Sequence, residues 1–353
     1  MLKQPVKHQA IWLTRLAIIL ALVVITLGGW TRLNDAGLSC PDWPGCFGKL
    51  VVPETSEEIT RAEQEFSGLR VDIDKGWLEM THRYAASGLG LVAMILVGVA
   101  GLNKDRKNYP FWHSVSLLLL VVIQGLFGMW TVTLKLLPIV VTLHLLGGLL
   151  TLALLIGLLQ KLKLLRLSES EGYEISASRS KLNIALKPAK QIASVAVVLL
   201  FMQLALGGWT STNYAGWSCT HWLYCQADIK TELDFIAGFN VETEIGPDYQ
   251  GGMLPQPARA AIQMAHRVGG LIVAIALLLL IGITMMRHNL RKPASVLLLL
   301  LVIQLGLGIA NVVLALPLLL AMAHHSGAVL LLLCLLWLKN CIEDTAPGPK
   351  KSG

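Results

Sequence analysis

Five histidines lie within long apolar stretches of this 353-residue chain, where ionisable side chains are costly and usually functional. They are His82, His144, His266 and the adjacent pair His324 and His325. An internal sequence repeat aligns His82 with His266 and His144 with His324. Each half of the chain therefore has one histidine early in its second apolar stretch and one early in its fourth. A single histidine of this kind often only bonds to a neighbouring helix, but two at matched depth in both halves indicate a binding site.

The chemistry that fits such pairs is metal ligation by neutral imidazole. Two imidazoles that face each other across a helix bundle suit axial ligation of haem iron from both sides. Zinc would instead require four protein ligands, or an open fourth position beside a carboxylate. Small residues follow each histidine and would allow close helix packing, or leave room for a flat macrocycle: Ala85, Ala86, Gly88, Gly147, Gly148, Gly269, Gly270 and Gly327. The sequence predicts a bis-histidine haem site in each half.

Arginines directly follow two of these histidines. Arg83 comes after His82, and Arg267 comes after His266. Their long side chains would either extend to lipid headgroups or pair with the propionates of a haem. The sequence leaves both interpretations open.

One position separates the halves chemically. Glu79 precedes His82 by three residues and projects to about the same helix face, whereas Gln263 precedes His266 at the matching position. A glutamate near a helix start is also favoured by the helix dipole alone. Because a carboxylate beside a cofactor can transfer protons and an amide cannot, Glu79 is the candidate catalytic residue.

Eight apolar stretches must position these side chains. The chain is 54% hydrophobic and only 14% charged, whereas soluble domains are about a quarter charged. Runs of about 18 or more apolar residues predict membrane-spanning helices. The stretches are 11–31, 82–102, 112–134, 139–159, 190–210, 264–286, 295–315 and 318–338. The sequence therefore predicts an all-α polytopic membrane protein.

The repeat divides these stretches into two sets of four. The segment GGWTRLNDAGLSCPDWPGC at 28–46 returns as GGWTSTNYAGWSCTHWLYC at 207–225. An even number of spans per half predicts parallel repeats about an axis along the membrane normal. We expect two pseudo-symmetric four-helix bundles, each able to hold a cofactor between facing helices. The predicted parts are an N-terminal bundle at 1–160, a cytoplasmic linker at 161–189 and a C-terminal bundle at 190–353.

Basic residues predict the orientation. Lysine and arginine concentrate before the first stretch and in the loops after the second, fourth and sixth, which places both termini in the cytoplasm. The cysteines at 40, 46, 219 and 225 then face the oxidising outer side, so the disulfides Cys40–Cys46 and Cys219–Cys225 are favoured over metal sites. The net charge of +7 reflects this topology and gives no indication of nucleic-acid binding.

Together these motifs resemble those of the heme A synthases over all eight stretches. The resemblance rests on the cysteine pairs, the glutamate–x–x–histidine–arginine motif at 79–83, HLLGG at 144–148, AHRVGG at 265–270 and the histidine-bearing start of the last stretch. It implies oxidation of the C8 methyl of heme O to a formyl group, which gives heme A for cytochrome c oxidase assembly. It further implies heme O as substrate in the N-terminal half and haem B in the C-terminal half.

The resemblance also implies a location and partners. The chain would lie in a bacterial inner membrane, with its cysteine loops and haem sites toward the outer face. Candidate partners are heme O, the heme O synthase, cytochrome oxidase assembly factors and the lipid bilayer. Two features depart from the family pattern: His325 lies beside His324, and the polar loop at 226–262 differs from its counterpart at 47–78.

Two non-enzymatic functions also fit paired histidines. One is a di-haem cytochrome that only transfers electrons from quinol, and the other is a haem carrier. Neither gives a reason for the difference between Glu79 and Gln263. On the register of the repeat, His324 rather than His325 is the expected fourth ligand, because each aligned histidine is followed three residues later by glycine.

Overall fold

The computed structural model describes residues 4–103, 109–170, 179–221, 225 and 232–344. Within these ranges the regular secondary structure is helical. An isolated backbone bridge joins Cys46 to Lys49. Eight helices in the described part are long and apolar enough to cross a membrane, so this is a multi-pass membrane protein. They are α1 (Gln4–Leu33), α3 (Ile73–Gly101), α4 (Phe111–Thr133), α5 (Pro138–Ser170), α6 (Arg179–Thr212), α8 (Gln256–Met285), α9 (Arg291–Val313) and α10 (Leu318–Asp344). The shorter helices are α2 (Ser56–Glu65), α7 (Phe235–Gly238) and the 3-10 turn η1 (His288–Leu290).

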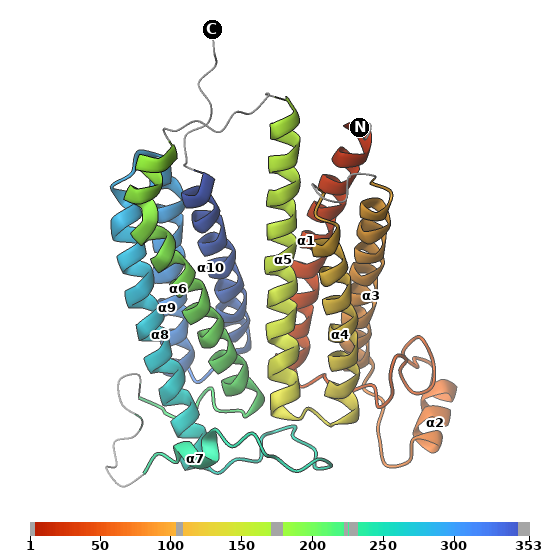
Figure 1. The fold of residues 1–353 in the computed structure, drawn as a ribbon. Coiled ribbons are helices and arrows are strands. Elements are labelled where there is room, and N and C mark those ends of the chain that lie inside the picture. The colour runs from red at the N-terminus through yellow and green to blue at the C-terminus, as the bar shows by residue number, and fades with distance from the viewer. Residues whose placement is uncertain (1–3, 104–108, 171–178, 222–224, 226–231, 345–353) are drawn as a thin grey trace. The chain divides into compact units, whose positions relative to one another are not determined.

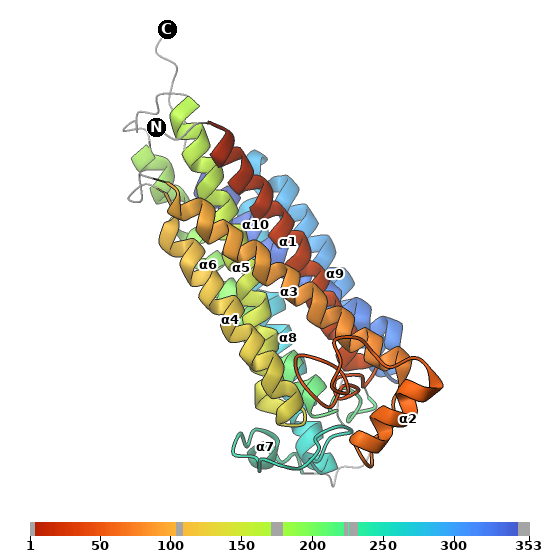
Figure 2. The same ribbon diagram turned by 90° about the vertical axis from the view of Figure 1, so that its right-hand side faces the viewer.

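The chain forms two compact units. The first extends to Ser168 and also includes Val241–Met253 from much later in the sequence. Its spanning helices α1, α3, α4 and α5 run side by side (Figure 1, Figure 2). Tyr249 of the later segment is buried against Leu136, Leu137 and Val140 at the turn between α4 and α5. A segment of the second half of the sequence thus contributes to the packing of the first unit.

The second unit contains Glu169–Asn240 and the chain from Leu254 onward. Its spanning helices contact one another in a closed order: α6 with α8, α8 with α9, α9 with α10, and α10 with α6. The short helix α7 packs against α8. The four helices therefore surround a common interior, which is where α8 and α10 can bring side chains together. A symmetric relation between the two units remains an expectation from the sequence repeat.

Two helices begin earlier than their apolar stretches. Helix α3 begins at Ile73, where the side chain of the N-cap residue Asp72 accepts a hydrogen bond from Lys75 N at 3.1 Å. Helix α8 begins at Gln256, directly after Pro255 and with a proline in its first turn. Polar residues interrupt the apolar residues in these first turns, so the predicted spans began about two turns after the helix starts. His82 and His266 consequently lie inside their helices and not at the helix starts.

Tight turns place the starts of α5 and α10 beside the ends of α4 and α9. Leu136 and Leu316 both adopt left-handed backbone conformations, with φ of 61°. Leu136 N donates to Thr131 O at 2.8 Å, and Leu316 N donates to Asn311 O at 2.7 Å. These bonds satisfy carbonyl groups that the helix ends would otherwise leave without partners. The turns keep each helix pair close enough for side-chain contact near the histidines.

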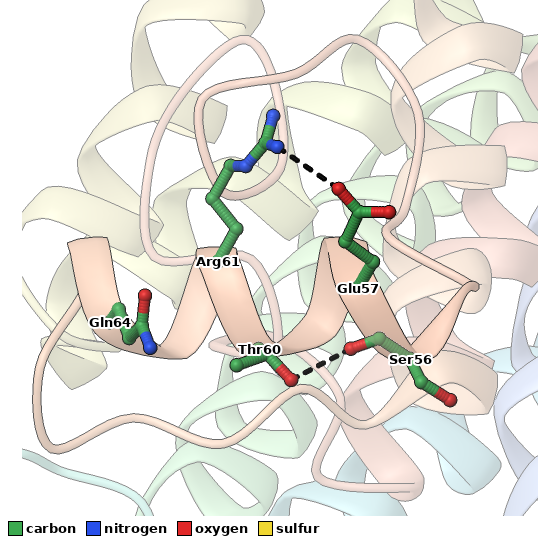
Figure 3. Close-up of a pocket in the computed structure, with 5 residues that line it drawn as sticks. All are labelled: Ser56, Glu57, Thr60, Arg61 and Gln64. Atoms are coloured by element: carbon green, nitrogen blue, oxygen red, sulfur yellow. Dashed lines mark hydrogen bonds and ion pairs between the residues drawn. The ribbon is translucent and has the colours of Figure 1, made fainter.

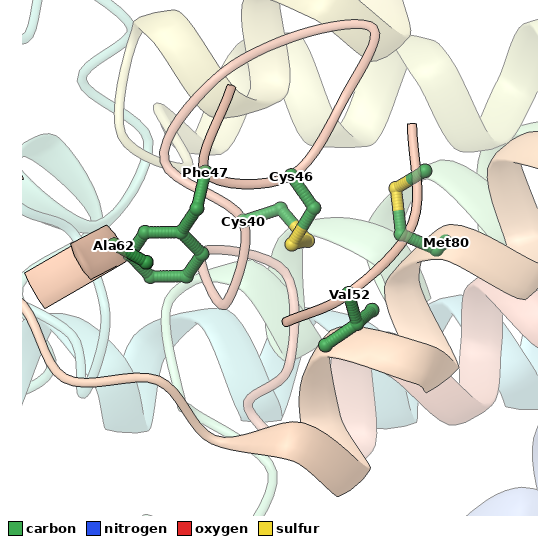
Figure 4. Packing of buried hydrophobic residues seen from close by; sticks show 6 residues of the cluster. All are labelled: Cys40, Cys46, Phe47, Val52, Ala62 and Met80. Atoms are coloured by element: carbon green, nitrogen blue, oxygen red, sulfur yellow. A yellow bond between two sulfur atoms is a disulfide. The ribbon is translucent and has the colours of Figure 1, made fainter. Parts of the chain in front are cut away.

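The loop after α1 folds over the first part of α3. It contains the disulfide Cys40–Cys46, which is buried in a small apolar cluster (Figure 4): Cys40, Cys46, Phe47, Val52, Ala62 and Met80. Helix α2 lies within this connection between α1 and α3 and begins with a capping box between Thr55 and Glu58. The hydrogen bond from Lys49, aided by backbone N–H groups, lowers the pKa of Glu58 from 4.5 to about 2.

The second unit has the equivalent disulfide, Cys219–Cys225. We call the end of each unit that carries its disulfide the disulfide end.

Candidate functional site

Each unit brings two histidines from different helices into contact. His82 on α3 and His144 on α5 have ring centroids 6.4 Å apart, with an angle of 81° between the rings. His266 on α8 and His324 on α10 have the same centroid distance of 6.4 Å, with an angle of 77°. Of the two adjacent histidines on α10, His324 is thus the one whose ring meets His266. All four rings are partly buried.

A glycine on the neighbouring helix lies against each ring. A Cβ atom added to Gly28 would lie 3.0 Å from His82 Nε2, and one added to Gly207 would lie 3.3 Å from His266 Cε1. A Cβ atom added to Gly128 would lie 3.5 Å from His144 Cε1, and one added to Gly308 would lie 3.2 Å from His324 Cε1. The absence of a side chain at these positions lets the imidazoles approach the facing backbone closely. The sequence repeat contains the signal for these glycines, since Gly28 aligns with Gly207 and Gly128 with Gly308.

The spacing of the rings fits two imidazoles on opposite sides of one metal ion. A metal–imidazole bond is about 2.0–2.1 Å long and the ligating nitrogen lies about 1.1 Å from its ring centre, which gives centroids about 6.2–6.4 Å apart. The Nδ1 atoms of His144 and His324 are also buried without a hydrogen-bond partner. No group of three or more His, Cys, Asp or Glu side chains that could hold a metal ion occurs in the described part of the chain. The residues therefore fit haem iron, whose other ligands come from the macrocycle, better than a metal ion held by protein alone.

Glu79 and Arg83 hold the first disulfide loop. Glu79 is 4% exposed as a whole residue, and its carboxylate accepts a hydrogen bond from Cys40 N at 2.9 Å. Its other oxygen lies 2.5 Å from Arg83 Nη2. Arg83 Nη1 in turn donates to the carbonyl groups of Asp42, Pro44 and Gly45. The predicted catalytic carboxylate is thus part of a network that fixes the loop to α3.

Gln263 and Arg267 occupy the matching positions in the second unit. Gln263 Oε1 accepts from Cys219 N at 2.5 Å, and its Nε2 donates to Gly216 O at 2.7 Å. Arg267 donates to Cys219 O at 2.9 Å and to His221 O at 2.6 Å. Both halves therefore use this pair of positions to hold a disulfide loop. The first unit adds a carboxylate–guanidinium ion pair between Glu79 and Arg83 to the network.

Three glutamines near the histidines were not predicted as site residues. Gln203 on α6 donates from Nε2 to His266 O at 2.9 Å, and the same nitrogen lies 3.0 Å from His266 Nδ1. Gln304 on α9 donates to His324 O at 3.0 Å. Gln124 on α4 packs against Gly147, three residues after His144. Gln124 and Gln304 align in the repeat, and that alignment is the signal that could have identified them.

A pocket of about 410 Å³ lies elsewhere, on helix α2 (Figure 3). Its lining residues all come from that helix: Ser56, Glu57, Thr60, Arg61 and Gln64. Arg61 and Glu57 form an ion pair at 3.3 Å, with side chains 68% and 85% exposed. The pocket is a feature of one exposed helix surface and contains none of the histidines.

The fold and the site define a multi-pass helical membrane protein with a partly buried histidine pair inside each of its two units. Comparison with known proteins identifies the family. The model of the family described as "Cytochrome oxidase assembly protein" (COX15-CtaA) matches residues 10–336, and the chain belongs to this family.

Curated relatives cover nearly the whole chain. A protein of Shewanella oneidensis named "Heme A synthase" is 39% identical over 93% of this chain and 94% of its own length. A "Heme A synthase" of Rhizobium etli is 28% identical over 93% of this chain and 88% of its own length. A third, from Cereibacter sphaeroides, is 27% identical over 97% of this chain and 90% of its own length.

Proposed function

We propose that this protein is a heme A synthase, which oxidises the C8 methyl group of heme O to a formyl group. The observation that carries the proposal is the histidine pair at 6.4 Å in each unit, found in a chain of this family with relatives named heme A synthase. Two successive two-electron oxidations, each adding one hydroxyl group, convert the methyl to a hydrate. Loss of water from the hydrate gives the aldehyde of heme A.

The histidines would hold two haem groups with different tasks. His82 and His144 would hold the substrate heme O in the first unit, while His266 and His324 would hold haem B as an electron relay in the second. Haem iron supplies the redox chemistry that no side chain provides. The glycines that face the rings let each imidazole keep a fixed position beside the neighbouring helix.

Glu79 would accept protons released by methyl oxidation. Its carboxylate lies between the disulfide loop and α3, one helical turn from His82. Each oxygen accepts a hydrogen bond and has a second lone pair, at which a proton could be taken up. Gln263 holds its loop in the same way but cannot take up a proton, which suits an electron relay. Arg83 and Arg267 position the loops, and their guanidinium groups would also face the propionates of a bound haem.

The disulfides and the distribution of basic residues support a location in a bacterial inner membrane. Disulfides persist on the oxidising side of that membrane, so the disulfide end of each unit would face outward and both termini the cytoplasm. Heme O is farnesylated and would reach the site from the bilayer. Heme O synthase and cytochrome oxidase assembly factors are therefore the partners that we propose before and after this step.

Mass analysis of extracted haems tests the function. Cells that co-express the chain with a heme O synthase should contain heme A or hydroxylated heme O, and cells without the heme O synthase should contain neither. A purified chain that binds two haems but yields only unmodified heme O would contradict the proposal and would favour a di-haem cytochrome.

A further inference from the structure

A basic residue precedes one histidine of each pair by two helical turns. Lys75 precedes His82 on α3, and Arg259 precedes His266 on α8. The register of the repeat that aligns the two histidines also aligns Lys75 with Arg259. Residues at this spacing project within about 20° of each other and lie about 10.5 Å apart along the helix axis. Each unit therefore has a cation on the same helix face as the histidine, toward its disulfide end.

The same face is apolar in the opposite direction. Two turns after the histidines, the aligned residues are Leu89 and Val273, which are 7% and 5% exposed. The face thus changes from a cation at the disulfide end, through the imidazole, to a hydrocarbon side chain. A haem is divided in the same way, because its two propionates leave one edge while the opposite edge carries methyl and vinyl groups. A haem ligated by these histidines fits with its propionates toward the disulfide end.

The two cations lie where a helix by itself disfavours them. Lys75 is the third residue of α3, and Arg259 is the fourth residue of α8. Both side chains belong to partly buried residues. The N-terminus of a helix is the positive end of its dipole, which repels cations and attracts anions. An anion bound at this level would offset the repulsion in both units.

The protein itself pairs these cations only weakly. Arg259 has a buried Nε atom without a hydrogen-bond partner, and it forms no ion pair with any residue that the structure describes. Lys75 Nζ has a long contact of 3.4 Å with Asp35 O. The Asp35 carboxylate instead pairs with Arg32 at 3.1 Å. Both Lys75 and Arg259 therefore remain able to bind an anion.

The repeat preserves the charge at this level although the residues differ. In the second unit, Ser211 replaces Arg32 and Tyr214 replaces Asp35. The ion pair of the first unit is thus lost as a whole, since both of its members change to uncharged residues. Among these aligned positions, each unit keeps one net positive charge.

We propose that Lys75 and Arg259 bind the propionates of the two haems and orient each haem with its carboxylate edge toward the disulfide end. This inference rests on the proposed function, because it assumes a haem between the histidines of each pair. A lysine or arginine that meets a propionate forms a charge-assisted hydrogen bond, which is stronger than a neutral one. Arg83 and Arg267 already donate to loop carbonyl groups, so a propionate gains a further donor from Lys75 or Arg259.

A haem whose propionates are esterified tests the proposal on the full-length protein. The chain carries His82→Ala and His144→Ala, so that only the second unit binds haem, and it is produced in cells that make no haem. It is then titrated with haem B or with haem B dimethyl ester, and the bis-histidine absorbance is measured. With Arg259 present, haem B should bind about 10- to 100-fold more tightly than the ester, as expected of one hydrogen bond to a charged group.

Replacing the cation should remove this preference. Arg259→Gln should bind haem B and the ester nearly equally, whereas Arg259→Lys should keep most of the preference. A side chain that only stabilises the fold would weaken both ligands alike. Arg287→Gln is the matched control, because it removes an exposed positive charge just beyond the other end of α8 and should leave the preference unchanged.

The first unit gives an independent test. In a chain with His266→Ala and His324→Ala, heme O should bind more tightly than its dimethyl ester. Lys75→Gln should remove the difference, and Lys75→Arg should retain it. Arg61→Gln is the control here, since its side chain is 68% exposed on α2. If one glutamine variant does not fold, the variant of the other unit decides.

A preference for the free acid that persists in the glutamine variants, or that is missing while Lys75 and Arg259 are present, would overturn the proposal. Such a result leaves the proposed function intact if the unmodified protein still forms heme A. Absence of bis-histidine absorbance from both units with either ligand would instead refute the haem sites, and the proposed function would fail as well.

Discussion

Replacing Glu79 with glutamine separates the two roles of its carboxylate, holding the disulfide loop and transferring protons. Glutamine at this position should still accept the hydrogen bond from Cys40 N, as Gln263 does from Cys219 N. It loses the ion pair with Arg83. In that pair the Arg83 side chain is only 11% exposed and the Glu79 side chain only 6%. Breaking a buried ion pair costs about 3–5 kcal/mol when the remaining charge has no other partner.

The expected cost here is smaller because Arg83 keeps its carbonyl acceptors in the loop. The loss is then closer to that of one hydrogen bond to a charged group, about 2 kcal/mol in the free energy of unfolding. Proteins are typically stable by about 5–15 kcal/mol, so most molecules of the variant should remain folded and loaded with haem. Loss of a general base lowers a rate by about 10²–10⁴-fold, which is a much larger effect.

The assay compares three quantities for Glu79→Gln in the full-length protein: thermal unfolding, haem content and the rate of heme A formation. We expect a small loss of stability, retained haem and a rate reduced at least about 100-fold. Gln263→Glu is the matched control, and it should alter the rate far less. A full rate of conversion in Glu79→Gln would show that the carboxylate only holds the loop. A loss of haem in proportion to activity would also refute a role in proton transfer.

Further substitutions test the other parts of the site. His324→Ala should abolish the bis-histidine absorbance of the second unit while His325→Ala retains it, and the reverse result would shift the ligand assignment by one residue. Gly147→Ala should lower first-unit haem content and cost about 1–3 kcal/mol in unfolding experiments, because its methyl group would overlap the glutamine amide packed on it. Gly125→Ala is its control, since a Cβ atom there has open space around it, and equal effects of the two would contradict this reasoning. Cys46→Ser opens a loop with a sequence separation of 6 and should lower the free energy of unfolding by about 2 kcal/mol, so an unchanged melting temperature would refute a stabilising role.

The sequence predicted the elements that have a strong periodic or repeated signal. Long apolar runs gave the eight spans, since a membrane-spanning helix requires such a run. The repeat related His82 to His266 and His144 to His324, and the structure places His82 in ring contact with His144 and His266 in ring contact with His324. The first turns of α3 and α8 lay outside the predicted spans because polar residues interrupt their apolar residues.

The roles of polar side chains depend on contacts that the sequence does not display. The sequence suggested lipid headgroups or propionates as partners of Arg83 and Arg267, and it did not indicate the loop carbonyls to which both donate in the structure. This contact depends on how the disulfide loop folds over α3 or α8. The packing of Tyr249 into the first unit is likewise a long-range contact without a local signal.

The most direct test of the account is a conversion experiment with the purified protein. The chain is loaded with heme O, supplied with a chemical reductant and oxygen, and its haems are then extracted and identified by mass. We predict hydroxylated heme O followed by heme A in the unmodified protein, and neither product in a variant that lacks both His82 and His144. Formation of heme A by that variant, or recovery of only heme O from the fully loaded unmodified protein, would contradict the account.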